Sequence, residues 1–482
     1  MSEGAGKAHE KLPGSSPEKR KIQAIKGVRD ILPPETALWN RVEQTAHEVF
    51  ATYGFGEIRL PIFEATELFA RSIGKDTDIV SKEMYTFEAH TDRLIEVFSE
   101  MRRIVVTEGT GSKNPMFENL EDEFREESKR GSSLTLRPEA TASVCRAYIE
   151  HGMHTLPGNV KLYYMGPMFR RERPQKGRYR QFYQIGAEVL SQSDDLKSLA
   201  RIDAELIEML LAFFEKTGLE GTTLYLNSIG CKDCRPKYVE LLRAELTKVK
   251  DKLGPDSQRR IETNPLRVLD SKLESEQAII EKLPRIADHL CGPCREQYAE
   301  VKQQLALRNI KYQENWRLVR GLDYYVRTTF EITAPGLGSQ NAVCGGGRYD
   351  GLVEQLGGPD TKGIGFSIGT DRLILSLQDM RKLPLERSLD VFVAWMGEKT
   401  YPAAVKIARR LRDAGVAVEL PPGEMKFGKA LGLADKLGAR YALIIGEDEL
   451  ASGQFTVKRL ADGEQKKLRE VELVDYLKEQ SE

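Results

Sequence analysis

A long helical stretch, residues 194–311, separates two groups of strand-like segments, and no other feature of the sequence constrains the fold as much. Apolar residues recur at helical spacing within the stretch, which is interrupted at 225–229. The strand-like segments are 133–136, 160–165 and 182–190 before it, and 317–323, 328–333 and 342–344 after it. We therefore predict one α+β domain, built from 22–193 and 312–385, with a helical domain inserted at 194–311.

The N-terminal part of the chain contains a tail, a helix, a strand and an insertion. Residues 1–21 are rich in Gly, Ser, Lys and Glu, a composition typical of disorder. Apolar residues recur at helical spacing over 35–53, and 57–61 alternates like a strand. Residues 89–132, with a dense acidic cluster at 118–127, break the pattern. We expect them to form a surface insertion.

The last part of the chain, 389–482, alternates short apolar strands with helices. Strands are expected at 391–395, 416–420 and 441–445, and helices at 401–414 and 426–437. This βαβαβ order predicts a separate, compact α/β domain with parallel strands.

Composition excludes several classes of protein. Lys and Arg number 72 against 73 Asp and Glu, so the net charge of −1 excludes a polycationic nucleic-acid coat but allows a local basic groove. Six cysteines are too few for a disulfide scaffold. The sequence has no apolar run of about 20 residues that could span a bilayer, and residues 1–20 lack the apolar region of a secretory signal. We expect a soluble, cytoplasmic protein of several domains with no membrane partner.

The densest group of chemically active side chains is the basic segment 169–182. Five arginines and a lysine lie in a predicted strand–loop–strand hairpin with aromatic residues on both flanks. Because side chains alternate along a strand, Arg170 and Glu172 share one face. That arrangement places a guanidinium that can pair with phosphate beside a carboxylate, while the loop arginines can contact a second polyanion. A solvated basic loop is the simple alternative.

Four further clusters are each compatible with an ordinary structural role. One strand is expected to end within 134–141, where the side chains of Arg137 and Glu139 point to the same side. Another is expected to end within 320–325, which carries paired tyrosines. The glycine-rich segments 344–351 and 363–372 have neither Rossmann nor P-loop spacing. Taken singly, none of these clusters identifies a function.

Taken together and in this order, the segments resemble the class II aminoacyl-tRNA synthetases, and most specifically the histidyl-tRNA synthetase family. The resemblance covers nearly the whole chain from Lys26 onward. Phe169-Arg170-Arg171-Glu172 is similar to class II motif 2, residues 57–61 to the motif 1 strand, and Gly369-Thr370-Asp371-Arg372 to motif 3. Segments 318–325 and 346–350 and the loop 175–180 resemble signatures of the histidine enzymes. The acidic insertion 89–132 departs from the shorter family pattern.

The resemblance implies a fold and an activity. The fold is a catalytic domain with an antiparallel sheet and flanking helices, followed by an anticodon-binding α/β domain at 389–482. The activity is ATP-dependent ligation of L-histidine to the 3′ end of tRNA(His) through a histidyl-adenylate, which releases AMP and diphosphate. Mg²⁺ accompanies ATP.

The resemblance also implies roles for individual residues. Arg320 and Arg170 match catalytic arginines, and Arg170, Glu172 and Arg372 match ATP contacts. The implied histidine-binding residues are Glu139, Thr141, Gln184, Glu188, Tyr324 and Tyr325. Gln175 and Arg180 match tRNA contacts. Helix 35–53 and strand 57–61 look like the class II dimer element, so a homodimer is expected.

Four of the cysteines form two C-x₂-C pairs in the helical stretch, Cys231 with Cys234 and Cys291 with Cys294. Four thiolates complete a closed tetrahedral zinc site, and each pair has the spacing of a zinc knuckle. Four ordinary cysteines are the alternative, because the family resemblance requires no metal there. A redox pair is disfavoured, since no thioredoxin-like pattern surrounds either pair.

Two other classes of protein are compatible with parts of the sequence. A synthetase-like regulatory subunit that senses histidine would generally lack the C-terminal domain and the catalytic arginine, whereas this chain has both 389–482 and Arg320. A metal-stabilised RNA-binding protein would not need Arg170, Glu172 and Arg372 as well. The synthetase interpretation accounts for all of these features together.

Overall fold

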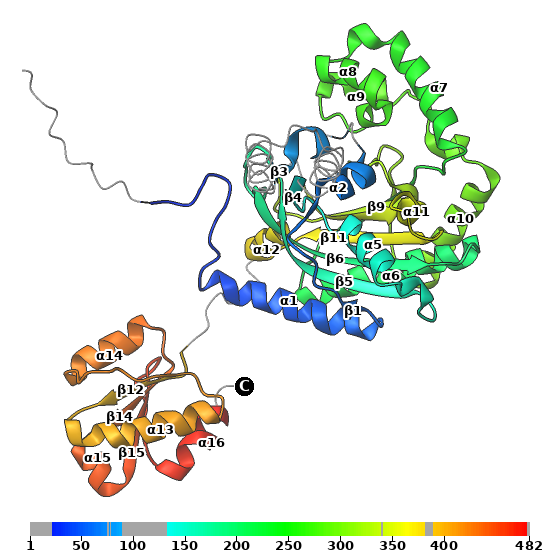
Figure 1. Cartoon of the computed structure of the whole chain (residues 1–482). Helices are drawn as coiled ribbons and strands as arrows, with labels where there is room; N and C mark the ends of the chain where they lie inside the picture. The colour runs from blue at the N-terminus through cyan, green and yellow to red at the C-terminus, as the bar shows by residue number, and fades with distance from the viewer. Residues whose placement is uncertain are drawn as a thin grey trace, which may run out of the picture. The chain divides into compact units, whose positions relative to one another are not determined.

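The structure, a computed structural model, describes residues 22–74, 77, 79–88, 133–338, 341–380 and 389–479. By its internal contacts the chain divides into a large unit that contains Leu38–Leu383 and a small unit that contains Pro384–Glu482 (Figure 1). The tail predicted at 1–21 and the insertion predicted at 89–132 lie outside the described residues.

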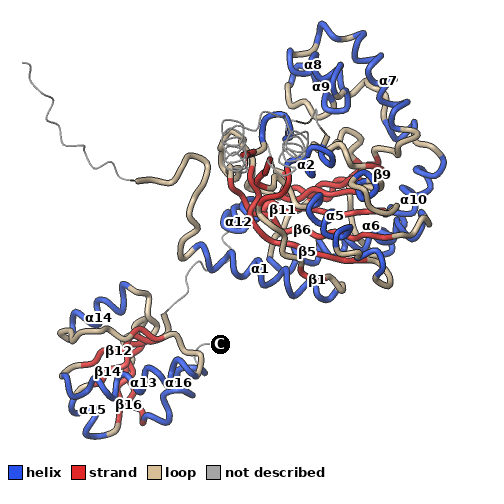
Figure 2. The backbone as a smooth tube through the Cα atoms, in the orientation of Figure 1, coloured by secondary structure: helices blue, strands red, loops and turns tan. Residues whose placement is uncertain are grey.

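An eight-stranded sheet forms the centre of the large unit (Figure 2). Its strands are, in spatial order, β1 (Gly56–Glu57), β5 (Val160–Phe169), β6 (Gln181–Ser191), β11 (Lys362–Gly369), β10 (Ala342–Arg348), β9 (Val326–Thr333), β7 (Thr223–Ser228) and β8 (Gln313–Glu314). The two edge pairs, β1·β5 and β7·β8, are parallel, and the five inner pairs are antiparallel. Strands from both sides of the helical stretch share this sheet, so the prediction of an antiparallel α+β fold is confirmed.

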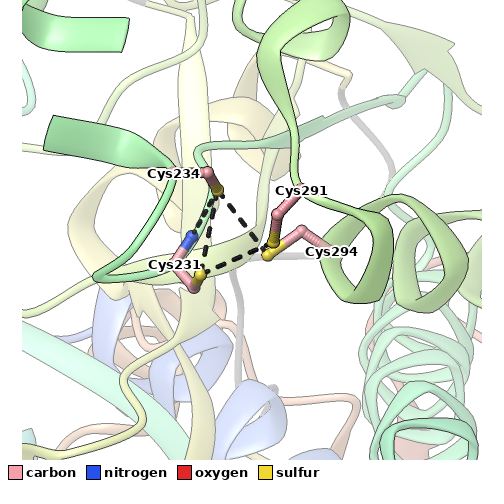
Figure 3. Close-up of side chains that lie close together, drawn as sticks. All are labelled: Cys231, Cys234, Cys291 and Cys294. Carbon is pink, nitrogen blue, oxygen red and sulfur yellow. Dashed lines mark hydrogen bonds between the residues drawn. The ribbon is translucent and has the colours of Figure 1, made fainter. Parts of the chain in front are cut away.

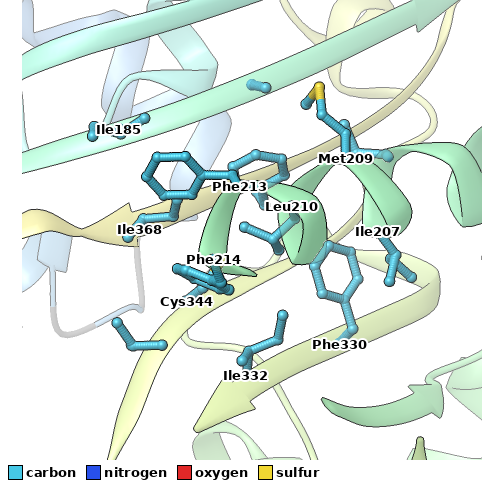
Figure 4. Close-up of a cluster of buried hydrophobic side chains, with 14 of the residues drawn as sticks. Ile185, Ile207, Met209, Leu210, Phe213, Phe214, Phe330, Ile332, Cys344 and Ile368 are labelled. Carbon is cyan, nitrogen blue, oxygen red and sulfur yellow. The ribbon is translucent and has the colours of Figure 1, made fainter. Parts of the chain in front are cut away.

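Four of the described helices share one hydrophobic core with the sheet: α1 (Glu35–Thr52), α6 (Leu196–Thr217), α10 (Gly292–Leu307) and α12 (Thr370–Asp379). Helix α6 begins at Asp195, whose carboxylate accepts from the amides of Lys197 and Ser198, and ends at the left-handed Gly218. Its apolar stripe, which includes Phe213, packs beside Phe330 of β9 (Figure 4). Burial of this apolar stripe against the sheet stabilises the packing of α6 on the sheet.

The stretch 194–311 is divided in the structure. Helices α6 and α10 and strand β7 belong to the core of the large unit. Helices α7 (Arg235–Lys248), α8 (Pro255–Thr263) and α9 (Glu274–Ile280) instead form a group apart from the sheet (Figure 1). We call these three helices the helical group.

Two predicted strands differ in the structure. Segment 317–323 is irregular. The side-chain amide of Asn227 donates hydrogen bonds to the carbonyls of Trp316 and Leu318, which would otherwise be available to a neighbouring strand. The strand predicted at 57–61 is reduced to β1. There the guanidinium of Arg137 donates hydrogen bonds to the carbonyls of Leu60, at 2.9 Å, and of Pro61, at 3.2 Å, so a neighbouring strand cannot bond them.

A small antiparallel sheet and a helix complete the surroundings of the site. The sheet has the order β2 (Phe63–Ala65), β4 (Ser133–Leu136), β3 (Tyr85–Glu88), and β4 leads directly to helix α5 (Thr141–Glu150). Residues 363–369 belong to β11, and helix α12 (Thr370–Asp379) follows without a loop.

The small unit has one five-stranded sheet, in the order β13 (Val418–Glu419), β12 (Val391–Trp395), β14 (Tyr441–Ile445), β15 (Gln454–Arg459), β16 (Gln465–Arg469). The first three strands are parallel, as predicted, with helices α13 (Tyr401–Asp413) and α14 (Phe427–Lys436) between them in sequence. The antiparallel pair β15·β16 was not predicted, because β16 buries only Leu468 and gives no apolar pattern. Among the described helices of both units, none is long and apolar enough to cross a membrane.

Candidate active site

A cavity of about 270 Å³ lies against the eight-stranded sheet of the large unit. It is bordered by β6, β10 and β11, by the β5–β6 hairpin, and by the starts of α5 and α12. Its lining includes ten of the predicted site residues: Glu139, Thr141, Arg170, Glu172, Gln184, Glu188, Arg320, Tyr324, Tyr325 and Arg372. Tertiary structure therefore brings together side chains from five separate regions of the sequence.

Glu139 is held at the N-terminus of α5. Its carboxylate accepts from the backbone amides of Thr141, at 2.8 Å, and Ala142, at 3.0 Å, and the hydroxyl of Tyr324 lies 3.4 Å from it. Burial raises the pKa of Glu139, while the two amide bonds oppose that rise. These hydrogen bonds orient the carboxyl group of Glu139, which can accept from a cationic group in the cavity.

Glu188 lies on β6, and two hydroxyls bind its carboxylate. Thr141 donates to Oε1 and Tyr349 donates to Oε2, each at 2.7 Å. Burial raises the pKa of Glu188 to about 8, although both hydrogen bonds favour the charged form, and the nearby charge of Glu139 adds to the rise. This group can therefore change its protonation state when a cationic or hydrogen-bonding ligand enters.

Two aromatic rings and an amide line the cavity beside these carboxylates. The ring centroids of Tyr324 and Tyr325 lie 4.7 Å apart, and both side chains are buried. The Oε1 atom of Gln184 on β6 is buried and has no hydrogen-bond partner among the described residues. A buried acceptor without a partner is costly unless a ligand supplies the donor.

Arg320 reaches the cavity from the irregular segment between β8 and β9. Its Nη1 donates to Glu331 of β9 at 3.1 Å, and its guanidinium lies 5.7 Å from the ring centre of Tyr325. Burial alone would lower the pKa of Arg320, but the phenol of Tyr325 and the carboxylate of Glu331 raise it above its usual value.

A second set of charges surrounds the β5–β6 hairpin. Arg170 donates from Nε to the carbonyl of Pro138 at 2.9 Å and covers the ring of Phe182. Glu172 lies 3.7 Å from Arg170 and forms a close ion pair with Arg178, so one carboxylate serves two guanidinium groups. Arg170 and Glu172 lie on the same side of the chain as predicted, but both follow the end of β5 and so do not lie on the strand itself.

Arg372, in the first turn of α12, joins this second set to β10. It donates from Nη1 to the carbonyl of Ala342 at 2.8 Å and from Nε to that of Gly177 at 3.4 Å. Burial lowers the pKa of Arg372, and the positive charges of Arg178 and Arg170 lower it further. Guanidinium groups outnumber carboxylates here, which favours a polyanionic ligand.

Two glycines on the central strands make room for these side chains. A Cβ atom at Gly345 of β10 would overlap the guanidinium of Arg320, and one at Gly365 of β11 would overlap the carboxylate of Glu188. The glycine-rich segments therefore shape the cavity, as close approach of side chains to backbone requires.

The two predicted tRNA contacts are not among the cavity-lining residues. Gln175 is exposed at the tip of the hairpin, where its backbone exchanges hydrogen bonds with that of Arg178. Arg180 is half-buried at the base of the hairpin, and its Nη1 donates to the carbonyl of the exposed Lys26 at 3.1 Å. The N-terminal segment around Gly27 thus braces the base of the hairpin.

A family model described as histidyl-tRNA synthetase matches residues 114–373, more than half of the chain. The chain belongs to the histidyl-tRNA synthetase family. A second model, described as an anticodon binding domain, matches residues 390–480, a range that lies within the bounds of the small unit.

Individual relatives in the histidyl-tRNA synthetase family agree over nearly full length. The histidine–tRNA ligase of Koribacter versatilis is 49% identical over 458 residues, covering 95% of this chain and 96% of the relative. That of Solibacter usitatus is 49% identical over 457 residues, covering 95% and 99%. The crystal structure of apo Staphylococcus aureus histidyl-tRNA synthetase superposes with a TM-score of 0.71 at 33% identity, covering 95% of this chain and 100% of that one.

Sequence reasoning missed two residues in this synthetase site. Tyr349 donates to Glu188, and Glu331 binds Arg320. Tyr349 lies within the 346–350 signature, which was recognised but given no role. Glu331 stands in an ordinary strand pattern, so no local signal marks it.

The four C-x₂-C cysteines lie outside the synthetase cavity. Their sulfur atoms all lie within 4.8 Å of one another, although the two pairs are far apart in sequence. This juxtaposition is what the zinc prediction required.

Proposed function

We propose that the protein is a histidine–tRNA ligase, which activates L-histidine with ATP and transfers it to the 3′ end of tRNA(His). One observation carries the proposal: a single cavity holds two hydrogen-bonded sets of side chains with different chemistry. Carboxylates and hydroxyls around Glu139 and Glu188 suit the cationic groups of histidine. Guanidinium groups around Arg170 and Arg372 suit the phosphates of ATP.

The histidine subsite consists of the first set. Glu139 and Thr141 receive the α-ammonium group, and Glu188, Tyr324 and Tyr325 surround the imidazole. Gln184 meets the carboxylate end of the amino acid with its side-chain NH₂ group, which can donate to a carboxylate oxygen. An amino acid without an imidazole would leave the buried Glu188 and its two hydroxyl partners without a ligand. Unpaired buried groups of this kind make a site selective.

The ATP subsite consists of the second set. Arg170 contacts the α-phosphate, Arg372 contacts the distal phosphates, and Glu172 binds the adenine. In the structure the carboxylate of Glu172 pairs with the guanidinium groups of Arg170 and Arg178. We expect ATP to take over these guanidinium groups and thereby free the carboxylate.

Adenylate formation joins the two subsites. An oxygen of the histidine carboxylate attacks the α-phosphorus, the bond to the β-phosphate breaks, and diphosphate leaves. Negative charge accumulates on the α-phosphate oxygens, where Arg170 and Arg320 stabilise it. The bond from Arg320 to Glu331 fixes that guanidinium before the substrates bind.

Mg²⁺ bound together with ATP would neutralise part of the phosphate charge. Oxygen ligands suit Mg²⁺, which takes one or two protein carboxylates together with substrate phosphates. Glu331, a carboxylate of the cavity lining that is not assigned to the adenine, would fit this requirement.

The tRNA is expected to contact both units. The exposed Gln175 at the hairpin tip and the nearby Arg180 serve the acceptor end, and residues 389–482 serve the anticodon. The extended basic loop gives tRNA binding that weakens as salt rises. Because the charged tRNA is consumed in translation, we place the protein in the cytoplasm.

A homodimer is part of the proposal. Strand β1 is an edge strand of the large sheet, and Ile62 and Phe63, just beyond it, are 46% and 54% exposed. An isologous pairing through this region would cover the apolar side chains on both copies. Sedimentation that shows a fully active monomer at micromolar concentration would contradict this part.

The decisive test is ATP–diphosphate exchange with each of the common amino acids in turn. We expect exchange with histidine and with no other. Exchange with another amino acid would refute the specificity. Histidine binding without exchange would indicate a regulatory subunit instead. Arg170→Ala should abolish the exchange, whereas Arg259→Ala, on the exposed face of α8, should leave it unchanged.

A further inference from the structure

Four cysteine side chains converge where the helical group meets the large sheet (Figure 3). Cys231 and Cys234 follow β7 and immediately precede α7, and Cys291 and Cys294 form the start of α10. Cys231, Cys234 and Cys294 are buried, and Cys291 is half-buried. All four sulfur atoms point toward one another (Figure 3).

The spacing of the sulfur atoms matches that of a metal-centred tetrahedron. Zn–S bonds of about 2.3 Å in a regular tetrahedron place neighbouring sulfur atoms about 3.8 Å apart. Three of the six separations are 3.8 Å from Cys231 to Cys234, 3.8 Å from Cys231 to Cys291, and 3.9 Å from Cys234 to Cys294, and all six are within 4.8 Å. A disulfide would need about 2.0 Å, and all four are free thiols.

The backbone is already arranged for thiolate ligands. The amide of Cys231 donates to Sγ of Cys234 at 3.3 Å, a contact that stabilises negative sulfur. Gly230 adopts a φ of +71°, and a Cβ atom there would press on the same sulfur. Ordinary packing of four cysteines requires neither the left-handed glycine nor an amide aimed at a thiol.

This cysteine cluster is connected to the histidine subsite by short hydrogen bonds. Arg235, the residue after Cys234, donates from Nη1 to the carbonyl of Tyr325 at 2.7 Å. Next to the pair, Gly230 and Arg327 are joined by a backbone hydrogen bond of 2.7 Å, and Arg327 has a φ of +53°. The backbone on both sides of Tyr325 is thus fixed by residues adjacent to the cluster.

The segment that carries Arg320, Tyr324 and Tyr325 needs such support because it has no regular secondary structure. Arg317 donates to Gln277 of α9 at 2.8 Å, and Asn264 lies 3.4 Å from Asp323. The segment therefore rests on the helical group, and the position of the helical group depends on the cysteine cluster where it joins the sheet.

We propose that Cys231, Cys234, Cys291 and Cys294 bind one structural Zn²⁺ and that this ion holds the 316–325 segment in its position at the histidine subsite. Four protein thiolates leave no open coordination position, so the ion takes no part in the reaction. The positioning role rests on the proposed function, whereas zinc binding does not.

The first test is metal content. Full-length protein purified under reducing conditions without chelator should contain one zinc per chain. Cys291→Ser, at the half-buried ligand, should lose most of that zinc, whereas Cys145→Ala, at a buried cysteine of α5 outside the cluster, should keep it. Replacement of zinc by Co²⁺ should give the absorption of a tetrahedral thiolate site. Protein that contains no zinc and binds none when it is added, or that binds iron instead, would overturn the site.

The second test separates the positioning role from the site itself. Zinc is removed from wild-type protein with a chelator, and ATP–diphosphate exchange is measured in excess Mg²⁺. The KM for histidine should rise several-fold while the KM for ATP changes less, and added Zn²⁺ should reverse the change. An unchanged KM for histidine in zinc-free, folded protein would refute the positioning role. If neither the zinc-bound nor the zinc-free protein catalysed the exchange, the proposed function would be refuted. The zinc site would then be judged by the metal content alone.

Discussion

Arg320 and Glu331 form a salt bridge of 3.1 Å that joins an irregular segment to strand β9 inside the cavity. The Nε atom of the same arginine is buried and has no partner among the described residues. One side of the guanidinium is thus anchored, and another is available for an anionic ligand. A cation oriented in advance stabilises a transition state without reorganisation.

Arg320→Ala should therefore slow the activation of histidine by roughly 10²-fold or more, the scale of losing one preorganised electrostatic contact. ATP–diphosphate exchange measures this step. Transfer of histidine from preformed adenylate should suffer much less, because the phosphate is then part of an activated leaving group. Arg320→Lys should retain part of the activity. If the rates of activation and of transfer fell equally, or if the variant were unfolded, the role of Arg320 would be structural only.

Glu188 predicts a pH dependence of histidine activation. Its pKa is raised to about 8, so the carboxyl is mostly protonated at pH 7 and charged at pH 9. If the charged form binds the imidazole, kcat/KM for histidine should rise through pH 8, since this parameter reports groups of the free enzyme. Glu188→Gln should lower kcat/KM and remove that inflection. An identical pH profile in the variant would disprove the assignment.

The same carboxyl predicts a pH-dependent cost in stability. Its folded pKa of about 8 lies above the usual value of 4.5, so the folded state binds the proton more tightly than the unfolded chain. The cost is absent below pH 4.5, grows between pH 4.5 and 8, and is constant above. Glu188→Gln should accordingly raise the melting temperature at pH 8 relative to wild type, and the difference should shrink toward pH 5. A difference that does not vary with pH would contradict this reasoning.

Gly345→Ala should damage the site without damaging the fold. The added methyl group would overlap the guanidinium of Arg320, which is a side chain that can move aside. We expect slower histidine activation with a melting temperature close to wild type. Gly428→Ala is the matched control, because a Cβ atom there meets nothing within 4 Å. Full activity of Gly345→Ala would mean that the position of Arg320 is not critical.

The two predicted tRNA contacts should behave differently. Gln175 is exposed, so Gln175→Ala should weaken aminoacylation of tRNA while leaving ATP–diphosphate exchange intact. Arg180 is bonded to Lys26 and packs on Gly27, so Arg180→Ala should disturb the hairpin and lower both activities. If both variants lost only aminoacylation, Arg180 would have to give up its hydrogen bond to Lys26 when tRNA binds.

Local sequence patterns were sufficient wherever the structural signal lies within a few residues. The helix at 35–53, the hairpin around 169–182 and the parallel strands of the small unit are all present. Each depends on periodicity, turn residues or spacing, which a single segment carries. The antiparallel strand β16 was missed because its exposed lysines and glutamine carry no such pattern.

The amino-acid sequence by itself determined the segments, their order, and the residue types available for chemistry. Only the tertiary structure decided that 317–323 is irregular, that Arg320 binds Glu331, and that Tyr349 binds Glu188. It likewise brought Cys231 and Cys291 within 3.8 Å across sixty residues of chain. These contacts join groups from different strands and helices. Their formation depends on burial and on competition for hydrogen bonds across the whole core, which no local pattern records.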